Sequence, residues 1–327
     1  MSSRLRVGVI GAGSIATIAQ LPSLAGRDDV DLAALVSRRN DPSSLVSRWG
    51  FGAAYRTVEQ MLESERLDAV FVLTPRSEHV VGVETTLSAG VDVFCEKPLA
   101  TVANDAVRLA DLAESADRIL MVGFNRRFAP TYQAGHDAFG ESGAVFCAAQ
   151  KNRNGSEYRA TFENSIHMVD LLRWYCGGEP TEVSASAAGE DLWQEDGVSA
   201  LVRFDTGHTG VLVAARNAGG WEESLDAYGG GVSVHVEAPD RIQVTRDGQT
   251  ISREMRAEAF GWATATATFG FRGAVDHFLD RVRDRAQPLT SGREAAHTQL
   301  LLDRILLAAG LPTEEQPGRS WTSHAQG

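Results

Sequence analysis

This chain of 327 residues has few cysteines, no long apolar run and a negative net charge. Its three cysteines, Cys95, Cys147 and Cys176, are few and odd in number. This suits a reducing compartment and argues against a disulfide framework. No apolar run approaches the roughly 18 residues that a membrane span needs. The first residues also lack a signal-peptide profile, since their apolar run is short and ends in glycines. We therefore expect a cytoplasmic protein.

The balance of charge excludes further classes of partner. A net charge of −12 disfavours nucleic acid or an anionic membrane as the main partner. An anionic small ligand stays open, because local charge decides its binding. The apolar content of 43% is enough for large cores, and the length suits two domains. The change from alternating strands and helices to mainly β-like runs places the domain boundary between residues 123 and 124, giving domains 1–123 and 124–327.

What is present in the first domain is a regular alternation of apolar strands with helical patterns. Strands are expected at 5–10, 31–36, 68–73, 91–95 and 119–123, the last three being the fourth, fifth and sixth strands. Helices are expected at 77–89 and 101–115, and a capping box at 57–60 indicates a further short helix. Such alternation predicts an α/β fold with a doubly wound parallel sheet.

A glycine-rich turn follows the first strand at once, with the sequence Gly11-Ala12-Gly13-Ser14-Ile15-Ala16. In such a turn the first glycine permits the tight bend, and the second lets a pyrophosphate approach the backbone. The alanine keeps helix and strand close, and the helix that follows offers its N–H groups to phosphates. An ordinary strand–helix turn is the alternative, and the context favours dinucleotide binding.

The second strand ends in Ser37-Arg38-Arg39, without the acid that commonly accepts hydrogen bonds from the ribose 2′-hydroxyl of NAD. A hydroxyl and two arginines suit a 2′-phosphate, because a guanidinium binds phosphate as a fork. The alternative is a solvated basic loop. We therefore favour NADP(H), with NAD(H) possible.

The fifth strand ends abruptly in Glu96-Lys97-Pro98. A lysine at this point places an ammonium group at the carboxyl edge of the sheet, where ligands of open α/β sheets bind. A dry lysine near an oxidised nicotinamide has a lowered pKa and can exchange a proton with a substrate oxygen. A surface lysine is the alternative. We predict that Lys97 faces a nicotinamide on one side and a substrate on the other.

After Phe124 the pattern becomes β-like. Strands are expected at 144–150, 182–188, 198–204, 209–215, 224–228, 232–237, 241–245 and 251–254, separated by turn signals such as Gly229-Gly230-Gly231. Helices are expected around 130–139, 164–176, 271–283 and 292–309. This predicts a C-terminal α+β domain with a large, mainly antiparallel sheet. The final helix is free to pack back on the first domain.

Several motifs together resemble the Gfo/Idh/MocA oxidoreductases, the family of glucose–fructose oxidoreductase and inositol dehydrogenase. They are the glycine-rich turn, Thr74-Pro75 with His79, Glu96-Lys97-Pro98, the stretch from Gly123 to Phe128, and His167-Met168-Val169-Asp170. The resemblance covers nearly the whole chain. It implies a Rossmann domain, an open-faced second sheet, and NAD(P)-linked oxidation or reduction of sugar or cyclitol carbons. It also implies a homodimer or homotetramer that packs through this sheet.

The resemblance assigns roles to particular residues. Lys97 matches the family's catalytic lysine, and the bond from Lys97 to Pro98 is cis in some relatives. His79 by itself also suits a packed or capping histidine. Together with the residues argued above, the predicted cofactor-binding set is Gly11, Gly13, Ser14, Ile15, Ala16, Ser37, Arg38, Arg39, Leu73, Thr74, Pro75, His79, Glu96, Lys97, Pro98 and Asn125.

The chain departs from the family around its second predicted catalytic residue, His167. Many members carry an aspartate four residues before this histidine, whereas Glu163 stands here. Glutamate keeps the carboxylate and adds a methylene. His167 is a candidate for proton transfer, with an ordinary pKa near about 6.5. Asp170 shares its helix face and could orient the imidazole or hold a substrate hydroxyl. A capping or core histidine and a surface acid are the alternatives.

Donor groups that suit a polyhydroxylated or anionic substrate follow two strands. We predict Arg126, Lys151, Asn152 and Arg153 as substrate-binding residues, with structural ion pairs as the alternative for any one of them. Trp174, Trp193, Trp221 and Trp262 could stack on a sugar ring or lie in a core or interface. No further histidine or cysteine joins Glu163, His167 and Asp170, so we predict no metal.

These expectations combine into one main hypothesis and two others. The main one is an NADP(H)-linked oxidoreductase of a sugar-like secondary alcohol or ketone, with Lys97 as proton donor and His167 assisting. The second is a related enzyme that reduces another carbonyl or C=C bond, or that holds its cofactor tightly. The third is a weakly active or inactive NADP(H)-binding regulatory or partner protein, for which the Glu163 departure is the support.

Overall fold

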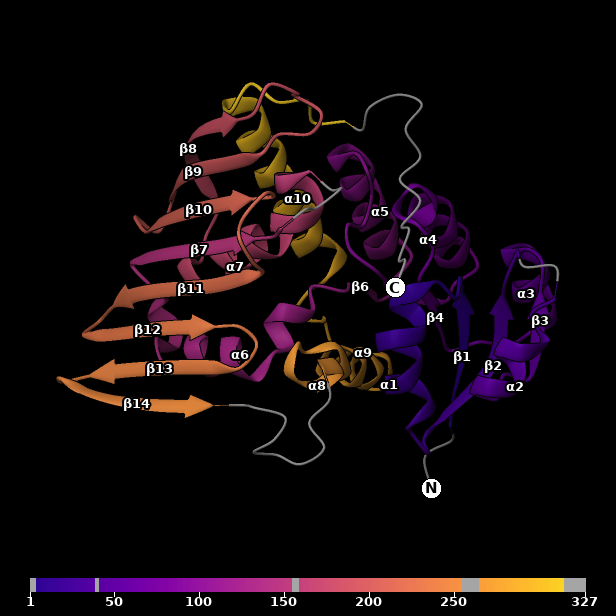
Figure 1. Ribbon diagram of the computed structural model, residues 1–327. Coiled ribbons are helices and arrows are strands. Elements are labelled where there is room, and N and C mark those ends of the chain that lie inside the picture. Colours follow the sequence, from indigo (N-terminus) through magenta and orange to yellow (C-terminus); the bar gives the residue numbers. More distant parts are fainter. Residues whose placement is uncertain (1–3, 39–40, 155–158, 255–264, 315–327) are drawn as a thin grey trace. The chain divides into compact units, whose positions relative to one another are not determined.

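The chain forms two compact units. The computed structural model describes residues 4–38, 41–154, 159–254 and 265–314 (Figure 1). Of the described residues, unit 1 comprises those up to Phe124 together with Phe271–Ala296, and unit 2 comprises those from Asn125 to Gly270 and from His297 to Glu314. Among the described residues, none of the helices is both long and apolar enough to span a membrane.

Unit 1 is built on a six-stranded parallel sheet with the order β3-β2-β1-β4-β5-β6. This is the strand order of a doubly wound dinucleotide-binding sheet. Its strands are β1 (Leu5–Ile10), β2 (Val30–Val36), β3 (Ala53–Tyr55), β4 (Ala69–Val72), β5 (Asp92–Cys95) and β6 (Leu120–Val122). The expected parallel sheet is therefore confirmed, and β3, which the sequence left without residues, is its short edge strand.

The helices of unit 1 connect these strands. They are η1 (Ala16–Gln20), α1 (Leu21–Ala25), α2 (Ser43–Trp49), α3 (Val58–Ser64), η2 (Arg76–Glu78), α4 (His79–Ser88), α5 (Ala103–Ser115) and α9 (Phe271–Asp284). The expected capping residue is present, because the Thr57 side chain accepts a hydrogen bond from the backbone N–H of Gln60 at the start of α3. Two helical beginnings differ from expectation: η1 is a π-helix, and the helix expected at 77–89 starts as the 3₁₀ turn η2.

Helix α9 belongs to unit 1 although it follows the whole second sheet in sequence. Phe278 of α9 packs against Phe71 and Phe94 at ring-centroid distances of 5.3 and 5.6 Å, and those two rings stack at 4.8 Å. Phe71 and Phe94 lie on the central strands β4 and β5. The sequence analysis placed the boundary at 123/124 and left only the final helix, 292–309, free to pack back on the first domain, whereas unit 1 includes Phe271–Ala296.

Unit 2 is built on an eight-stranded sheet with the order β14-β13-β12-β11-β7-β10-β9-β8. Its strands are β7 (Phe146–Asn152), β8 (Pro180–Ala188), β9 (Gly197–Phe204), β10 (Thr209–Ala215), β11 (Glu222–Gly229), β12 (Val232–Glu237), β13 (Arg241–Arg246) and β14 (Gln249–Glu254). Among the described strand pairs of this sheet, only β7 and β10 run parallel to each other. The mainly antiparallel sheet is thus confirmed. Strand β11 begins two residues earlier than expected, at Glu222, which brings Glu223 into the sheet.

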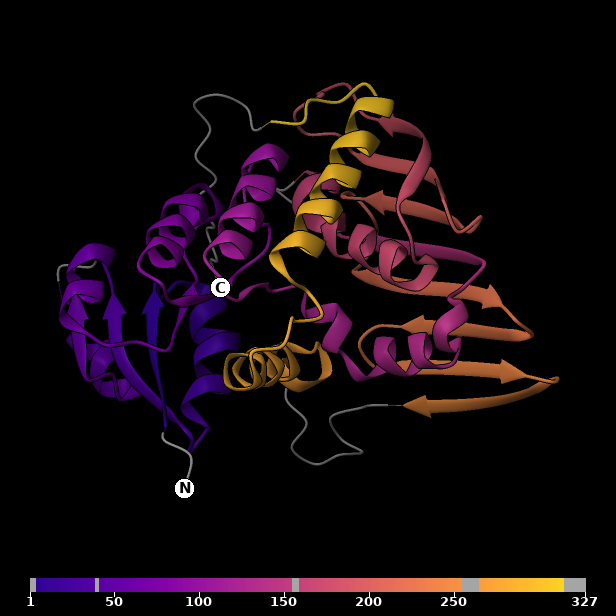
Figure 2. The ribbon, with the colours of Figure 1, turned by 180° about the vertical axis from the view of Figure 1, so that it is seen from behind.

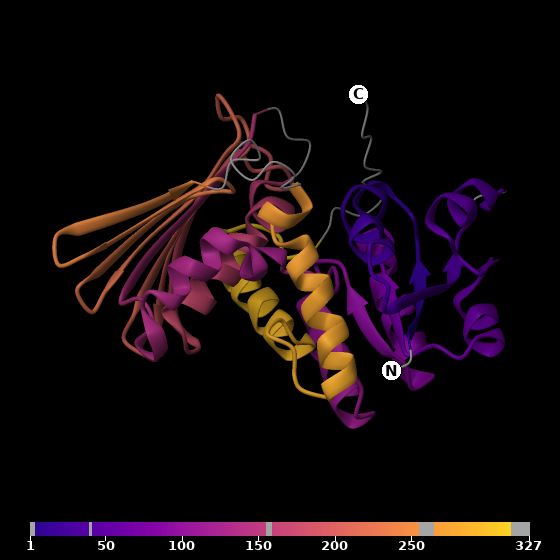
Figure 3. The same ribbon diagram turned by 90° about the horizontal axis from the view of Figure 1, so that it is seen from below.

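The helices of unit 2 gather on one face of this sheet. They are η3 (Asn125–Phe128), α6 (Pro130–Asp137), η4 (Gly140–Ser142), η5 (Ala160–Ser165), α7 (Ile166–Cys176), α8 (Ala265–Thr268) and α10 (Gly292–Ala308), the last starting in unit 1. Figures 2 and 3 show α6, α7 and α10 beside the same face. The opposite face carries exposed apolar side chains, among them Phe146, Leu201, Val213 and Tyr228. One face of the sheet is therefore open in the described chain.

Candidate active site

Lys97 lies at the carboxyl edge of the unit 1 sheet. Ile10, Val72, Cys95 and Val122 stand side by side in the register of β1, β4, β5 and β6. The residues that follow them therefore line one edge, which brings Gly11, Leu73, Glu96 and Gly123 together. Lys97 is half-buried just beyond this row, and its bond to Pro98 is cis. This edge is where ligands of such sheets bind.

Glu96, which precedes the lysine, is fully buried and firmly held. Its Oε1 accepts a hydrogen bond of 2.6 Å from Nε2 of Gln20, and its Oε2 accepts the backbone N–H of Lys97 at 3.2 Å. A Cβ on Gly123 would stand 3.3 Å from the same Oε2, so glycine there leaves room for the carboxyl. Burial raises the pKa of Glu96, against the opposing effects of Gln20 and Lys97.

His79 is buried and meets two backbone carbonyls. Its Nδ1 lies 2.7 Å from the oxygen of Pro98, and its Nε2 lies 2.9 Å from the oxygen of Thr74. Both contacts could be hydrogen bonds only if the ring were protonated. Burial lowers the pKa of His79 more than the two carbonyls raise it, and Lys97 and Arg76 lower it further. The neutral ring thus donates to one carbonyl, and its role in the fold is to join two loops.

The glycine-rich turn has the space that a dinucleotide needs. Gly11 has φ of +89°, and a Cβ there would stand 2.9 Å from the Thr74 side chain. Above Gly13 a Cβ would meet nothing within 4 Å. Within the described residues, the buried hydroxyl of Thr74 has no hydrogen-bond partner. Open space over exposed backbone and an orphaned hydroxyl beside it fit a bound NAD(P).

The end of β2 carries the residues on which the NADP(H) prediction rests. Ser37 is buried, whereas the Arg38 side chain is 73% exposed and forms an ion pair with Glu78 of η2. Arg39 lies outside the described residues. Arg38 therefore stands at the predicted position with an acidic neighbour that the sequence prediction did not include.

In unit 2, the predicted residues His167 and Asp170 lie on α7, and both are buried. The carboxylate of Asp170 receives two hydrogen bonds from Arg127, of 2.9 and 2.7 Å, and one of 3.2 Å from the hydroxyl of Thr298. The backbone of Glu163 belongs to the π-helix η5, and its side chain lies outside the described residues. The expected helix at 164–176 therefore begins as a π turn. Lys97 belongs to unit 1 and His167 to unit 2.

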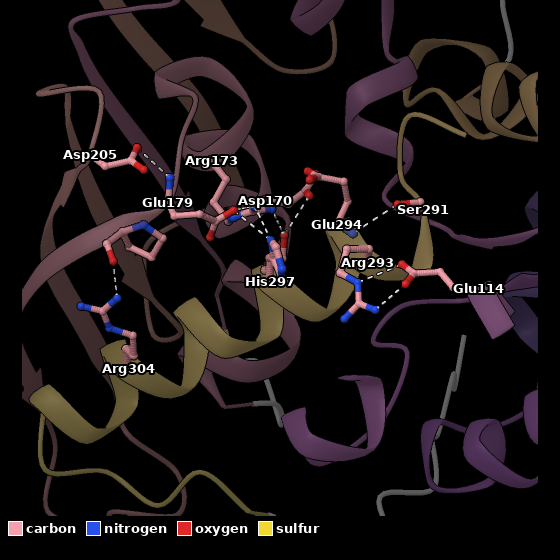
Figure 4. Close-up of polar contacts among 12 residues, drawn as sticks. Glu114, Asp170, Arg173, Glu179, Asp205, Ser291, Arg293, Glu294, His297 and Arg304 are labelled. Atoms are coloured by element: carbon pink, nitrogen blue, oxygen red, sulfur yellow. Dashed lines mark hydrogen bonds and ion pairs between the residues drawn. The ribbon is translucent and has the colours of Figure 1, made fainter. Parts of the chain in front are cut away.

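Polar contacts join α7 to α10 within unit 2 (Figure 4). Glu179 accepts hydrogen bonds from Arg173 of α7 and His297 of α10, both at 2.8 Å. Thr298, next to His297, reaches Asp170 as described above. These contacts fix the helix that carries His167 and Asp170.

Two of the four predicted substrate-binding residues meet a single buried carboxylate. Glu223 of β11 receives a forked pair of hydrogen bonds from Arg126, at 2.6 and 2.8 Å. Lys151 of β7 lies 2.8 Å from Oε2 of Glu223, and the Tyr132 hydroxyl donates to Oε1 at 3.1 Å. The side chains of Lys151 and Glu223 are 2% and 0% exposed. The ion-pair alternative thus describes the contacts of Arg126 and Lys151.

Burial and charge act differently on these groups. Burial lowers the pKa of Lys151 to about 7, because it outweighs the attraction of Glu223, and Arg126 and Arg153 act in the same direction. Burial alone would raise the pKa of Glu223, but Lys151 and Arg126 together hold it well below its ordinary range. Glu223 is therefore ionised beside the cation of Arg126, and Lys151 adds a second cation below a pH of about 7.

The remaining predicted residues of unit 2 have structural contacts as well. Asn152 accepts the backbone N–H of Ala215 at 3.0 Å and donates to Glu222 at 3.1 Å. Asn125 donates to the backbone oxygen of Phe269 at 2.6 Å. Trp221 is 41% exposed and packs edge-on against Phe269, while Trp262 lies outside the described residues. In the described chain no group of three or more His, Cys, Asp or Glu could hold a metal ion.

Gln20 and Glu223 are among the residues of these clusters that sequence reasoning missed. Gln20 is a lone amide among Ala19, Leu21 and Leu24, and a polar residue inside an apolar helix calls for a partner. Glu223 alternates with Leu225 and Ala227, which places it on the buried face of β11. Both signals were available, but neither names the partner.

Comparison with known proteins agrees with this architecture. Residues 5–124 match the family model described as "Oxidoreductase family, NAD-binding Rossmann fold", and residues 148–235 match "GFO/IDH/MocA C-terminal domain". An inositol 2-dehydrogenase of Acidothermus cellulolyticus is 30% identical over 318 residues, which cover 89% of this chain and 87% of that protein. The chain belongs to the Gfo/Idh/MocA oxidoreductase family. It is accordingly an oxidoreductase with an NAD-binding Rossmann domain.

Other members extend the comparison. An inositol 2-dehydrogenase of Rhizobium meliloti is 25% identical over 320 residues, covering 91% of this chain and 95% of that protein. Among solved structures, UDP-N-acetylglucosamine 3-dehydrogenase of Acidithiobacillus ferrooxidans superimposes with a TM-score of 0.82 at 18% identity, covering 94% of this chain and 98% of that one. At this identity the superposition supports the shared fold alone.

Proposed function

We propose that this oxidoreductase uses NADP(H) to move a hydride to or from a secondary alcohol or ketone of a sugar, sugar derivative or cyclitol. The observation that carries the proposal is the place of Lys97. It stands at the carboxyl edge of β5, in the same row of strand ends as the glycine-rich turn. A ligand on that turn would therefore lie along the edge from which Lys97 projects.

Each residue has a defined task in this proposal. The bound nicotinamide supplies or accepts the hydride. Lys97 gives a proton to the substrate oxygen, or takes one from it, and its charge stabilises the developing alkoxide. His167 assists proton transfer, and Asp170, held by Arg127, orients it. The N–H groups after Gly13 and the hydroxyl of Thr74 bind the cofactor's phosphates and ribose.

The substrate class is supported by what the relatives are named for. Two of them are inositol 2-dehydrogenases, and a third, 27% identical over 290 residues, is the D-apiose dehydrogenase of Paraburkholderia graminis. Inositol and apiose are polyhydroxylated and uncharged. Arg126 and Lys151 are paired with Glu223, and Asn152 with Ala215 and Glu222, so each would share its polar groups between these partners and a substrate. Arg153 is proposed as a further contact.

The test of this function follows NADPH absorbance with a panel of keto-sugars and inosose, and the reverse reaction with inositols and aldoses. Lys97→Met should abolish turnover, and Lys97→Arg should do so too, because a guanidinium does not release its proton. The matched control Arg108→Met removes an exposed cation of α5 and should leave turnover intact. Full activity in Lys97→Met would refute the assignment.

The preference for NADP(H) has its own experiment. Titration should show tighter binding of NADP(H) than of NAD(H), because the cation of Arg38 suits a 2′-phosphate. Arg38→Ala should shrink this preference, and Glu78→Gln should enlarge it by releasing Arg38 from its ion pair. Tighter binding of NAD(H) by the unaltered protein would overturn the reading of Ser37, Arg38 and Arg39.

The alternative function is a weakly active NADP(H)-binding regulatory or partner protein, favoured by glutamate at position 163. Binding of NADPH without turnover on the whole panel would support it.

For either function we propose a homodimer or homotetramer that covers the open face of the unit 2 sheet. Phe146, Leu201, Val213 and Tyr228 are exposed there. Light scattering should show a multimer, and Leu201→Lys with Val213→Lys should dissociate it.

A further inference from the structure

The two residues next to Lys97 in sequence, Glu96 and Pro98, each contact one buried side chain. Gln20 binds the carboxyl of Glu96, and His79 contacts the carbonyl of Pro98. We propose that Gln20 and His79 are positioning residues that together hold Lys97 in its reactive orientation and tie it to the cofactor loop. The inference rests on the proposed function of Lys97, and its test reads Lys97 directly.

We call Gln20, Glu96, His79 and Pro98 the frame of Lys97. Its first half, the contact of Gln20 with Glu96, depends on the π-helix η1. Gln20 is its last residue, fully buried, and its amide stands 2.6 Å from Glu96. A π turn adds a residue to the helical repeat and so changes which side chain faces the sheet. Because Glu96 also accepts the N–H of Lys97, the amide of Gln20 fixes the carboxyl that in turn fixes the lysine backbone. Gly123 leaves the space in which this carboxyl sits.

The second half links Lys97 to the glycine-rich turn. His79 begins α4 and is 1% exposed. One ring nitrogen faces Pro98 and the other faces Thr74, whose side chain closely approaches Gly11. A continuous series of contacts therefore runs from Gly11 through Thr74, His79 and Pro98 to Lys97. With a single proton on the ring, one carbonyl is hydrogen-bonded at a time, and the other contact is maintained by packing.

Charged groups act on both the carboxyl of Glu96 and the ring of His79. Glu96 is influenced by Gln20 and Lys97, and it acts on the buried thiol of Cys95. His79 is influenced by Lys97 and Arg76. Loss of the Gln20 donor would raise the pKa of Glu96 further, so that Glu96 would carry less negative charge next to Lys97 at a given pH. The titration of Lys97 should then move to lower pH.

The composition offers a direct readout, because the chain contains only two lysines, Lys97 and Lys151. Protein labelled with ¹³C at the lysine ε carbon should give two signals, and Lys151→Met identifies that of Lys97. The test variants are Gln20→Met, which keeps the volume and loses the donor, and His79→Phe, which loses both ring nitrogens. The controls are His79→Gln, which keeps one N–H donor, and Thr86→Val, which removes a buried hydroxyl of α4 that donates to the Gly82 carbonyl.

We expect the Lys97 signal to titrate at lower pH in Gln20→Met and to shift or broaden in His79→Phe. The kcat should fall about 10- to 100-fold in each, as expected for a misplaced reacting group, with little change in cofactor KM. His79→Gln should recover part of this loss, and Thr86→Val should change neither readout. If Gln20→Met does not fold, Gln20→Asn, whose amide is one methylene too short, replaces it.

The outcomes separate the two claims. An unchanged Lys97 signal and titration in both test variants would overturn the frame, even if turnover fell. Equal losses in Thr86→Val would do the same, since they would reduce the effect to general packing. Full turnover in Lys97→Met would instead refute the proposed function, while the Lys97 signal would still decide whether Gln20 and His79 hold this lysine.

Discussion

Two buried glutamates, one in each unit, respond to burial in opposite ways. Glu96 follows β5 in unit 1, and Glu223 lies on β11 in unit 2, and both are almost completely inaccessible to solvent. The pKa of Glu96 is raised, whereas that of Glu223 is strongly lowered. Burial favours the neutral carboxyl in both, so the partners must account for the difference.

The partners of the two carboxyls differ in charge. Glu96 receives a neutral amide from Gln20 and a backbone N–H, with Lys97 as a nearby cation. Glu223 contacts two buried cations and a phenol, which occupy both of its oxygens. A neutral donor offsets desolvation only in part, whereas two close cations exceed it. Glu96, beside the proposed catalytic lysine, therefore takes up a proton at a higher pH than an ordinary glutamate. Glu223, on strand β11, instead stays ionised.

The largest expected effect is that of Glu223→Gln. Removing the carboxylate would leave Arg126 and Lys151 buried without an anion, which should lower the free energy of unfolding by about 3–5 kcal/mol. Urea denaturation measures this loss. The control is Glu237→Gln on β12, whose ion pair with Arg241 is exposed and should matter by less than about 1 kcal/mol. Equal effects of the two variants would show that burial adds nothing to the Glu223 interactions.

Lys151→Met should cost clearly less than Glu223→Gln. Glu223 would keep the forked pair from Arg126 and the hydroxyl of Tyr132, so no uncompensated charge would remain. We expect a loss below about 2 kcal/mol by urea denaturation. In the double variant, Lys151→Met should restore part of the stability lost in Glu223→Gln. Strict additivity of the two losses would contradict the proposed sharing of one carboxylate.

The pH dependence of stability should show the titration of Lys151. Its pKa falls from 10.5 in the unfolded chain to about 7 in the fold. Between these values the unfolded chain binds more protons, so the free energy of unfolding should rise with pH from about 7 to 10.5. Denaturation of the wild type at several pH values, minus that of Lys151→Met, isolates this slope. A difference that stays flat would place the folded pKa near its ordinary value.

Glu96→Gln should have the smallest effect on stability, below about 1 kcal/mol, because the site already favours a neutral group of this shape. The sign of its pH dependence is opposite to that of Lys151. With a raised folded pKa, the stability contributed by Glu96 is present below its unfolded pKa of 4.5 and is lost as pH rises through the folded value. Denaturation of wild type and Glu96→Gln between pH 4 and 8 measures it. A loss as large as that of Glu223→Gln would refute the contrast between the two glutamates.

Much of the fold could be predicted from local pattern, because apolar runs and glycines act within a few residues. The strands of both sheets and the glycine-rich turn were found in this way. The exceptions are instructive. Helix α9 joins unit 1 through Phe278, and nothing near Phe278 in sequence identifies Phe71 and Phe94 as its partners. The three-residue strand β3 is too short for its alternation to be read.

The candidate site was predicted unevenly. The position of Lys97 followed from the end of an apolar strand, which parallel pairing places at a known edge. The partners of Arg126 and Lys151 did not follow, because Glu223 lies 97 and 72 residues away from them in sequence. Side-chain type suggested donors for a substrate, and only the fold revealed that both face one carboxylate. The roles of Lys97, His167 and Asp170 remain predictions for the experiments above.

By itself, the sequence determined the family, the two sheets and the strand end on which Lys97 stands, since these depend on short motifs and on the period of apolar residues. The tertiary structure alone decided which buried charges meet, and which glutamate has its pKa raised and which has it lowered. Desolvation and ion pairing depend on distances of a few ångströms between residues far apart in the chain, and no local pattern encodes those distances.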